Sequence, residues 1–160
     1  MAVFRLSEVD RDGNVNTTFL NGKIAGVGGF PNISANARHS IFVGSFTAGG
    51  LKCHIEDGKM CIDQEGRFDK FVESCAQLSF NAQQCLAKGN RVTFITERCV
   101  IKRTAQGMVL AEVAPGIDIQ TQILDHMGFK PIIPEGGTGP HGRRPVLRDL
   151  GTPGRPFLGK

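Results

Sequence analysis

The sequence predicts an α/β fold in which a mixed β-sheet is flanked by a few short helices. The apolar run IFVG at residues 41–44 is short and uninterrupted, which is typical of a strand buried on both faces of a parallel or mixed sheet. Residues 51–55 instead alternate apolar and polar side chains, which is typical of an antiparallel strand. Segments with helical character, each followed by a glycine, lie among these runs.

The first forty residues are expected to form short strands joined by turns. Residues 3–9 alternate well enough for a strand, and the segment DRDGN that follows is a strong turn signal. Residues 14–19 are expected to return as a second short strand. The segment NISANAR then predicts a brief helical turn, with polar residues that can cap it, before the buried strand.

A β-hairpin is expected after a glycine-rich break at residues 47–50. Asp57-Gly58 is a dipeptide that favours a two-residue hairpin turn, and Met60 and Ile62 then lie on the returning strand. A further strand is expected within residues 71–80.

The second half of the chain predicts two helices and three strands. Residues 81–88 fit a short helix that ends at Gly89. Residues 118–127 predict an amphipathic helix, because apolar residues recur there at helical spacing and Gly128 follows. The strands are expected over residues 91–95, 99–102 and 108–113, with Gln106-Gly107 as the last turn.

Composition divides the chain into a folded part, residues 1–133, and a tail, residues 134–160. The tail holds twelve Gly or Pro among its 27 residues and shows no hydrophobic periodicity, so we expect it to be disordered or loosely attached. It also carries five Lys or Arg against two acidic residues, which accounts for most of the formal net charge of +4. The basic balance therefore says little about what the folded part binds.

Composition also limits the function classes. No apolar run approaches the roughly 20 residues that span a membrane, and the N-terminus has no signal-peptide pattern, so a cytoplasmic location is expected. The five cysteines are odd in number and include no CxxC pair, which predicts reduced thiols and neither a disulfide framework nor a zinc site. No histidine has metal-ligand spacing to a nearby Cys or carboxylate, so we expect no metal site and structural roles for His39, His54, His126 and His141.

The segment GVGGFPNIS at residues 26–34 allows two interpretations. Three glycines in four residues allow a sharp backbone turn, because glycine tolerates positive φ values. The same glycines also expose backbone N–H groups that can closely approach a phosphate or a developing oxyanion.

Five segments in order carry a resemblance to one family: EVDRDGNVN, GVGGFPNIS, FVGSFTAGGLK, VTFITERCVIK and LAEVAPGIDIQTQILDHMGFKPII. Over roughly residues 2–133 the chain resembles the C-terminal end, the beta half, of CoA-transferases that act on acetate, propionate and 3-ketoacids. The long single-chain type, called acetate or propionate CoA-transferase, is the nearest in pattern. Each segment alone is a weak signal, but their order and spacing together are specific.

The resemblance implies transfer of CoA between a short-chain acyl-CoA and acetate or a 3-ketoacid through a glutamyl-CoA thioester, in short-chain fatty acid or ketone-body metabolism. Coenzyme A is then a substrate, and no permanently bound cofactor is expected. The resemblance places the glycine run opposite the nucleophile, with Gly28 and Gly29 as the best candidates for an amide directed at the thioester carbonyl. The oxyanion and CoA-binding residues that it implies are Gly26, Gly28, Gly29, Asn32, Thr47, Gly49 and Gly50.

The resemblance also implies parts that this chain lacks. The family's catalytic glutamate lies upstream in a Glu-x-Gly context, so we expect no catalytic residue here and no turnover by the chain alone. Glu65 and Glu135 precede glycines but do not align with that nucleophile, and we expect both to be solvated surface carboxylates. Glu97 and Glu112 are expected to be structural. The other half of the enzyme is the expected partner, and exposed edges predict homo-oligomers.

Other function classes compete with this interpretation. A non-catalytic acyl-CoA or phosphate-binding module would use the glycine run as an anion cradle, with Lys52 or Arg38 adding charge. A truncated remnant of the enzyme would look the same in sequence. Nucleic-acid binding by the tail is disfavoured, because its arginines are few and no aromatic residue is interleaved before Phe157.

Overall fold

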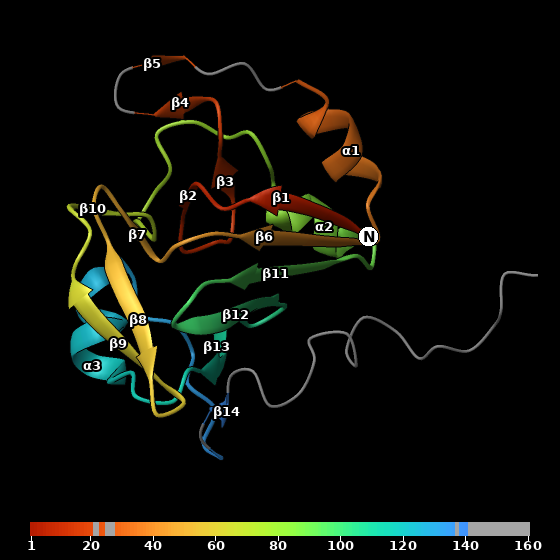
Figure 1. The fold of residues 1–160 in the computed structure, drawn as a ribbon. Coiled ribbons are helices and arrows are strands. Elements are labelled where there is room, and N and C mark those ends of the chain that lie inside the picture. The colour runs from red at the N-terminus through yellow and green to blue at the C-terminus, as the bar shows by residue number, and fades with distance from the viewer. Residues whose placement is uncertain (21–22, 25–27, 137, 141–160) are drawn as a thin grey trace, which may run out of the picture.

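The computed structural model describes residues 1–20, 23–24, 28–136 and 138–140, and its centre is a six-stranded sheet (Figure 1). The strand order is β1-β6-β11-β12-β13-β14. The first three strands are parallel, the β11–β12 and β12–β13 pairs are antiparallel, and β13–β14 is parallel. The predicted mixed sheet is thereby confirmed. Its strands are β1 (Ala2–Arg5), β6 (His39–Val43), β11 (Arg91–Ile95), β12 (Cys99–Thr104), β13 (Gly107–Val113) and β14 (Gly139–Pro140).

The remaining described strands form four two-stranded pairs. These are β2 (Glu8–Val9) with β3 (Val15–Asn16), β4 (Phe19–Leu20) with β5 (Lys23–Ile24), β7 (Thr47–Ala48) with β10 (Phe68–Asp69), and β8 (Lys52–Glu56) with β9 (Lys59–Gln64). The predicted turn of the β8–β9 hairpin is confirmed. Its central residues, Asp57 and Gly58, have φ values of +50° and +74°, as a type I′ turn requires.

Short helices flank the sheet: α1 (Phe30–Asn36), α2 (Ala82–Ala87), α3 (Ile119–Gln122) and the 3₁₀ turn η1 (Leu124–His126). Figure 1 shows α1 near the end of the sheet where β6 begins, and α3 near the opposite end, toward which β6 runs. The Asn81 side chain caps α2 by accepting a hydrogen bond from the Gln84 N–H at 2.8 Å. No helix among the described residues is both long enough and apolar enough to cross a membrane.

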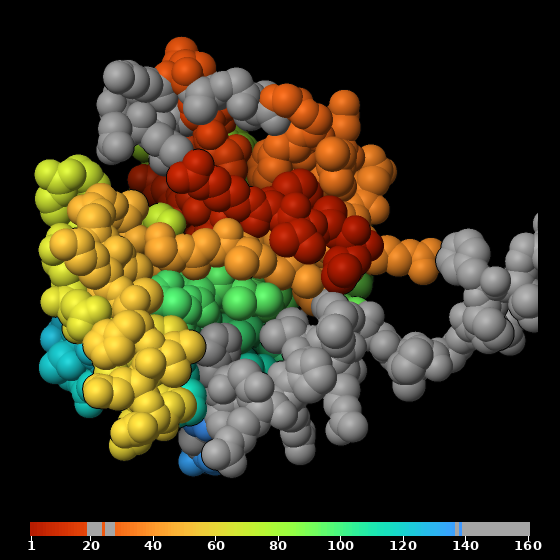
Figure 2. Space-filling model, in the orientation of Figure 1, coloured from red at the N-terminus to blue at the C-terminus, as the bar shows by residue number. Residues whose placement is uncertain are grey.

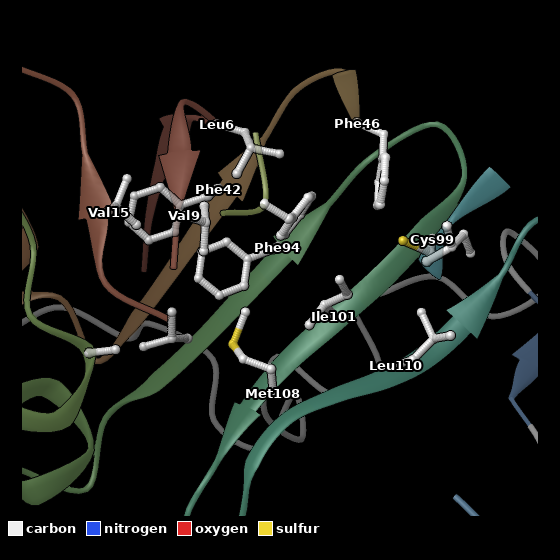
Figure 3. Close-up of a cluster of buried hydrophobic side chains, with 14 of the residues drawn as sticks. Leu6, Val9, Val15, Phe42, Phe46, Phe94, Cys99, Ile101, Met108 and Leu110 are labelled. Atoms are coloured by element: carbon white, nitrogen blue, oxygen red, sulfur yellow. The ribbon is translucent and has the colours of Figure 1, made fainter. Parts of the chain in front are cut away.

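Phenylalanine rings organise the core on one face of the sheet (Figure 3). Phe42 of β6 stacks on Phe94 of β11 with ring centroids 5.3 Å apart, and both rings are fully buried. The Phe80 ring meets Phe42 edge-on at 5.2 Å. Such aromatic pairs contribute about 0.5–1.5 kcal/mol each beyond their buried area. Phe42 and Phe94 stack because the parallel register places them side by side.

Three predicted strands differ in the structure. Residues 14–19 do not form one strand, because β3 covers only Val15–Asn16 and β4 begins at Phe19 in another two-stranded sheet. Residues 3–9 form β1 and β2 in separate sheets, because β1 pairs with β6 only as far as Arg5, whereas Val9 pairs with Val15 of β3. Residues 71–80 contain no strand, although Phe71 and Phe80 each form isolated bridges. These single-residue contacts join segments far apart in the chain, and alternation within one segment does not reveal them.

The helix predicted over residues 118–127 is also broken. α3 ends at Gln122, and η1 follows with a hydrogen bond from the His126 N–H to the Ile123 carbonyl at 3.1 Å. A continuous helix would direct the His126 N–H to the Gln122 carbonyl. That carbonyl instead accepts a hydrogen bond from Arg98 Nη1 at 2.6 Å. A tertiary contact thus replaces a local one.

The boundary at residue 133 stays a prediction. Most of the tail, residues 141–160, lies outside the described residues. Gly139 and Pro140, which the sequence assigns to the tail, pair with Glu112 and Val113 of β13.

Candidate functional site

A pocket of about 650 Å³ lies at the carboxyl ends of the parallel strands β6 and β11. Its walls come from the segments that follow these strands and from the start of the β8–β9 hairpin. They include Gly44, Thr47, Gly49, Gly50, Thr96 and Glu97. The volume is within the usual range of small-molecule sites, and the carboxyl ends of parallel strands are where such sites form in open α/β sheets.

The structure gathers only some of the residues that the sequence singles out. Thr47, Gly49 and Gly50 line the pocket together. Gly28 and Gly29 precede α1, Asn32 lies exposed on that helix, and none of the three is in the pocket lining. Gly26 lies outside the described residues. Gly28 does have a φ of +51°, a left-handed conformation that glycine adopts readily.

A fully buried arginine beside the pocket is the feature that sequence reasoning missed. Arg98 Nη2 donates to Glu65 Oε1 at 2.5 Å, and its Nε donates to Glu97 Oε1 at 2.9 Å. Its guanidinium also lies over the Phe46 ring, 5.0 Å from the centroid. Burial by itself would lower the pKa of Arg98, but the hydrogen bonds to the two carboxylates raise it. The only sequence signal is a pair of opposite charges, Glu97-Arg98, between two apolar strands.

Glu65 joins the hairpin to this arginine. Its Oε1 accepts hydrogen bonds from Thr47 Oγ1 at 2.5 Å and from the Gly66 N–H at 3.0 Å, besides the one from Arg98. Burial acts to raise the pKa of Glu65, but the hydrogen bonds from Arg98, Thr47 and Gly66 outweigh it and lower the pKa to about 2. The expectation of a solvated surface carboxylate is therefore wrong for Glu65, whose side chain is 27% exposed.

Glu97 reaches from the end of β11 to the segment after β6. Its Oε2 accepts a hydrogen bond from the Phe46 N–H at 2.9 Å, and its Oε1 pairs with Arg98. The two pocket walls are therefore joined by one carboxylate. This geometry agrees with the structural role expected of Glu97.

Lys70 places a second cation beside the pocket. Its Nζ donates to the carbonyl and the hydroxyl of Ser45 at 2.8 and 2.9 Å. Burial, and then the charge of Arg5, lower the pKa of Lys70. Since Ser45 lines the pocket, this lysine fixes the wall after β6.

The histidines have closer ionic neighbours than the sequence indicates. His54 Nδ1 lies 2.9 Å from Asp63 Oδ2, and His126 Nε2 lies 3.4 Å from Glu65 Oε2. Spacing along the sequence does not reveal these carboxylates, because strand pairing and chain return bring them to the histidines. His39 is buried against Thr93, and burial lowers its pKa to about 4. All five cysteines are free thiols, whereas His141 lies outside the described residues.

Comparison with curated proteins shows that the chain is similar to CoA-transferases. The chain is 47% identical over 127 residues to the acetate CoA-transferase YdiF of Escherichia coli strain K12, a match covering 79% of this chain and 24% of that protein. It is 39% identical over 140 residues to the caffeate CoA-transferase of Acetobacterium woodii, covering 83% of this chain and 26% of that protein. The matches lie in the C-terminal part of these relatives. The chain spans about a quarter of their length, and no protein-family model matches it.

Comparison with solved structures agrees. The acyl-CoA transferase YdiF of E. coli O157:H7, solved as a thioester complex with CoA, superimposes with a TM-score of 0.83 at 44% sequence identity. The match covers 85% of this chain and 27% of that chain. Both comparisons therefore find YdiF as a relative, and each match covers about a quarter of it.

Proposed function

Because this chain is homologous to the C-terminal part of the CoA-transferases, we propose that it supplies one wall of a site that moves CoA between a short-chain acyl-CoA and acetate or a 3-ketoacid. Acyl-CoA and a free carboxylate are the proposed substrates, in short-chain fatty acid or ketone-body metabolism in the cytoplasm. The observation that carries the proposal is the pocket at the ends of β6 and β11, lined by Thr47, Gly49 and Gly50.

The proposed reaction proceeds by covalent catalysis. A glutamate carboxylate attacks the acyl-CoA carbonyl, the C–S bond breaks, and the CoA thiolate departs. The glutamate is then joined to the acyl group as an acyl-glutamyl anhydride. The thiolate then attacks the glutamyl carbonyl, which releases the acyl carboxylate and leaves a glutamyl-CoA thioester. A second carboxylate takes the CoA by the reverse sequence.

The nucleophilic glutamate is proposed to come from a part of the enzyme that lies outside this chain. Glu65 is poorly suited to the role, because a carboxylate with a pKa of about 2 that accepts three hydrogen bonds is a weak nucleophile. Glu97 is likewise engaged with Arg98 and the Phe46 N–H. Both carboxylates hold the pocket walls instead, and the chain alone is proposed to show no turnover.

The oxyanion donors are proposed from the glycine run and the pocket. Gly28 and Gly29 are both exposed, so an acyl-CoA carbonyl can approach the backbone there. Donors of this kind stabilise tetrahedral intermediates by about 3–4 kcal/mol each. Thr47, Gly49 and Gly50 of the pocket are proposed as further CoA-binding residues, although the structure does not bring them next to Gly28 and Gly29. Asn32 and Gly26, which lies outside the described residues, are proposed together with the glycine run.

Trapping the thioester tests the catalytic part of the proposal. The chain is incubated with acetyl-CoA and borohydride, first alone and then mixed with the part of E. coli YdiF that it does not match, and the peptides are examined by mass spectrometry. Borohydride reduces a glutamyl thioester to an alcohol, which changes the mass of the modified peptide. We expect a mark only on the added part. A mark on this chain alone would overturn the proposal and identify Glu65, Glu97 or Glu112 as a nucleophile.

Cysteine footprinting tests the pocket independently. Cys53 is exposed and lines the pocket, whereas Cys61 lies on the opposite face of the same hairpin. In the mixture with the YdiF part, we expect acetyl-CoA to slow alkylation of Cys53 and to leave Cys61 unchanged. Protection of Cys53 without any thioester would favour a binding module instead, and equal alkylation rates with and without acetyl-CoA would contradict the pocket assignment.

A further inference from the structure

We propose that one face of the β8–β9 hairpin binds a divalent transition-metal ion, with Zn²⁺ the expected occupant. The ligands are His54 and Glu56 of β8 and Cys61 of β9. The proposal rests on side-chain geometry at the surface of the hairpin and is independent of the CoA-transferase function.

The antiparallel register brings the three ligand groups together. His54 pairs directly with Cys61 across the hairpin, and Glu56 lies two residues from His54 on the same face of β8. One ligand atom from each residue lies within 4.8 Å of the others, and His54 Nε2 is 3.9 Å from Glu56 Oε2. No sequence motif predicts this cluster, because two of its members meet only across the hairpin.

The cluster suits zinc in chemistry and in size. Imidazole nitrogen, thiolate and carboxylate are all zinc ligands, at about 2.0–2.3 Å from the ion. Tetrahedral coordination at those lengths separates ligand atoms by roughly 3.3–3.8 Å. The observed separations need only a small inward rotation of two exposed side chains, His54 and Glu56, toward the partly buried Cys61. Three protein ligands leave a fourth position for water.

Asp63 supplies the support that a ligating histidine usually has. Asp63 lies on β9, two residues after Cys61, and its Oδ2 is 2.9 Å from His54 Nδ1. A carboxylate that accepts the Nδ1 proton fixes the ring and leaves Nε2 toward the metal. The same hydrogen bond raises the pKa of His54. Four chemically matched groups therefore converge on one face.

The hairpin is anchored well enough to hold such a site. The Met60 N–H donates to the Pro115 carbonyl at 2.7 Å, and Gln64 Nε2 donates to the Gly50 carbonyl at 2.9 Å. Figure 2 shows the hairpin, in yellow, at the surface of the molecule. The cluster is thus open to ions from solvent, while β9 is held at Met60 by the hydrogen bond to Pro115 and at its end by the Gln64 side chain.

Cobalt spectroscopy tests the proposal on the full chain. Co²⁺ replaces Zn²⁺ in such sites, and a cysteine thiolate bound to it gives an intense sulfur-to-cobalt charge-transfer band. We expect this band to saturate at one equivalent and to disappear when Zn²⁺ is added. Binding also releases the Cys61 thiol proton to solvent. No band with excess Co²⁺ would overturn the proposal.

Matched variants locate the site. Cys61→Ser should abolish the band, whereas Cys53→Ser, a change of the exposed cysteine on the other face, should retain it. Asp63→Asn should weaken binding about 10–100-fold, as loss of an outer hydrogen-bond partner does. Persistence of the band in Cys61→Ser would overturn the assignment of the site. An unchanged affinity of Asp63→Asn for Co²⁺ would contradict the supporting role of Asp63.

Thermal melting gives a readout that is independent of the colour. Zn²⁺ that binds the folded chain should raise the melting temperature of the wild type by mass action. His54→Ala and Cys61→Ser should lose this increase and keep the wild-type melting temperature in EDTA, because both side chains lie on a surface hairpin. An equal zinc-dependent increase in the variants would contradict the proposed site.

Discussion

At the scale of single residues, Arg98 organises the pocket. A buried guanidinium needs partners for its donors, and Arg98 finds them in Glu65, Glu97 and the Gln122 carbonyl. These partners come from the hairpin, from its own neighbour in sequence and from α3. One side chain therefore sets the relative positions of three segments around the proposed acyl-CoA pocket.

Removing this charge should be costly. In Arg98→Leu the carboxylates of Glu65 and Glu97 remain in place without their buried cation, and breaking a buried pair costs about 3–5 kcal/mol. We expect the free energy of unfolding, measured by urea denaturation, to fall by that amount.

An exposed ion pair is the matched control. Arg11 pairs with Glu73, and both side chains are more than half exposed. Arg11→Ala should change the unfolding free energy by less than about 1 kcal/mol, since surface pairs contribute little. Equal effects of the two substitutions would show that Arg98 has no special role in the fold.

Glu65 should make stability depend on acidity. Its pKa is lowered from 4.5 to about 2, so the folded state binds its proton less readily than the unfolded state does. The contribution is fully present above about pH 4.5 and is lost as the pH falls toward 2, for a total of about 3 kcal/mol. Glu65→Gln should flatten the dependence of the unfolding free energy on pH in that window. Identical slopes in the two proteins would refute the assignment.

At the scale of elements, Gly66 lets the β9–β10 connection pass close to β7. A Cβ at residue 66 would lie 2.6 Å from the Ala48 carbonyl oxygen and 2.6 Å from Thr47 Oγ1. Only glycine allows this approach, and it is this approach that brings Glu65 within reach of Thr47 and Arg98.

Gly66→Ala should therefore disturb the pocket as well as the fold. Overpacking of this kind costs about 1–3 kcal/mol, which calorimetry or urea denaturation would measure. Gly29→Ala is the control for stability, because a Cβ there meets only the Ile33 side chain at 3.4 Å, an ordinary contact. If Gly29→Ala destabilised the protein as much as Gly66→Ala, close approach at residue 66 would not be the cause.

At the scale of the whole molecule, the described chain leaves apolar groups and a strand edge in contact with solvent. β1 is the end strand of the six-stranded sheet, and Val3 on it is 59% exposed. Ile24, Ile55 and Leu78 are each more than half exposed as well. Open edges and apolar surface favour association between copies.

We therefore predict that the chain alone self-associates. Sedimentation velocity at micromolar concentration should show dimers or larger species, and Val3→Lys should shift the distribution toward monomer because a charge blocks edge pairing. Leu78→Lys adds the same charge away from the sheet edge and should leave the larger species in place. A monodisperse wild-type monomer would contradict the prediction.

The local parts of the fold were predictable and the contacts between distant segments were not. The β8–β9 hairpin and the strands from residue 91 to residue 113 follow from alternation and turn residues that lie next to one another in the chain. The break after Gln122 depends on Arg98, which lies 24 residues earlier, so helical periodicity across 118–127 could not reveal it.

The sequence by itself determined the mixed sheet, the hairpin and the five segments whose order along the chain indicates CoA-transferases, because each depends on residues close together in the chain. Tertiary structure decided which of the candidate residues share a pocket: Thr47, Gly49 and Gly50 do, whereas Gly28 and Gly29 lie elsewhere, before α1. It also decided that Glu65, only partly buried, pairs with the buried Arg98, and that His54 faces Cys61. These pairings arise from chain return and strand register, which bring together groups that no local spacing relates.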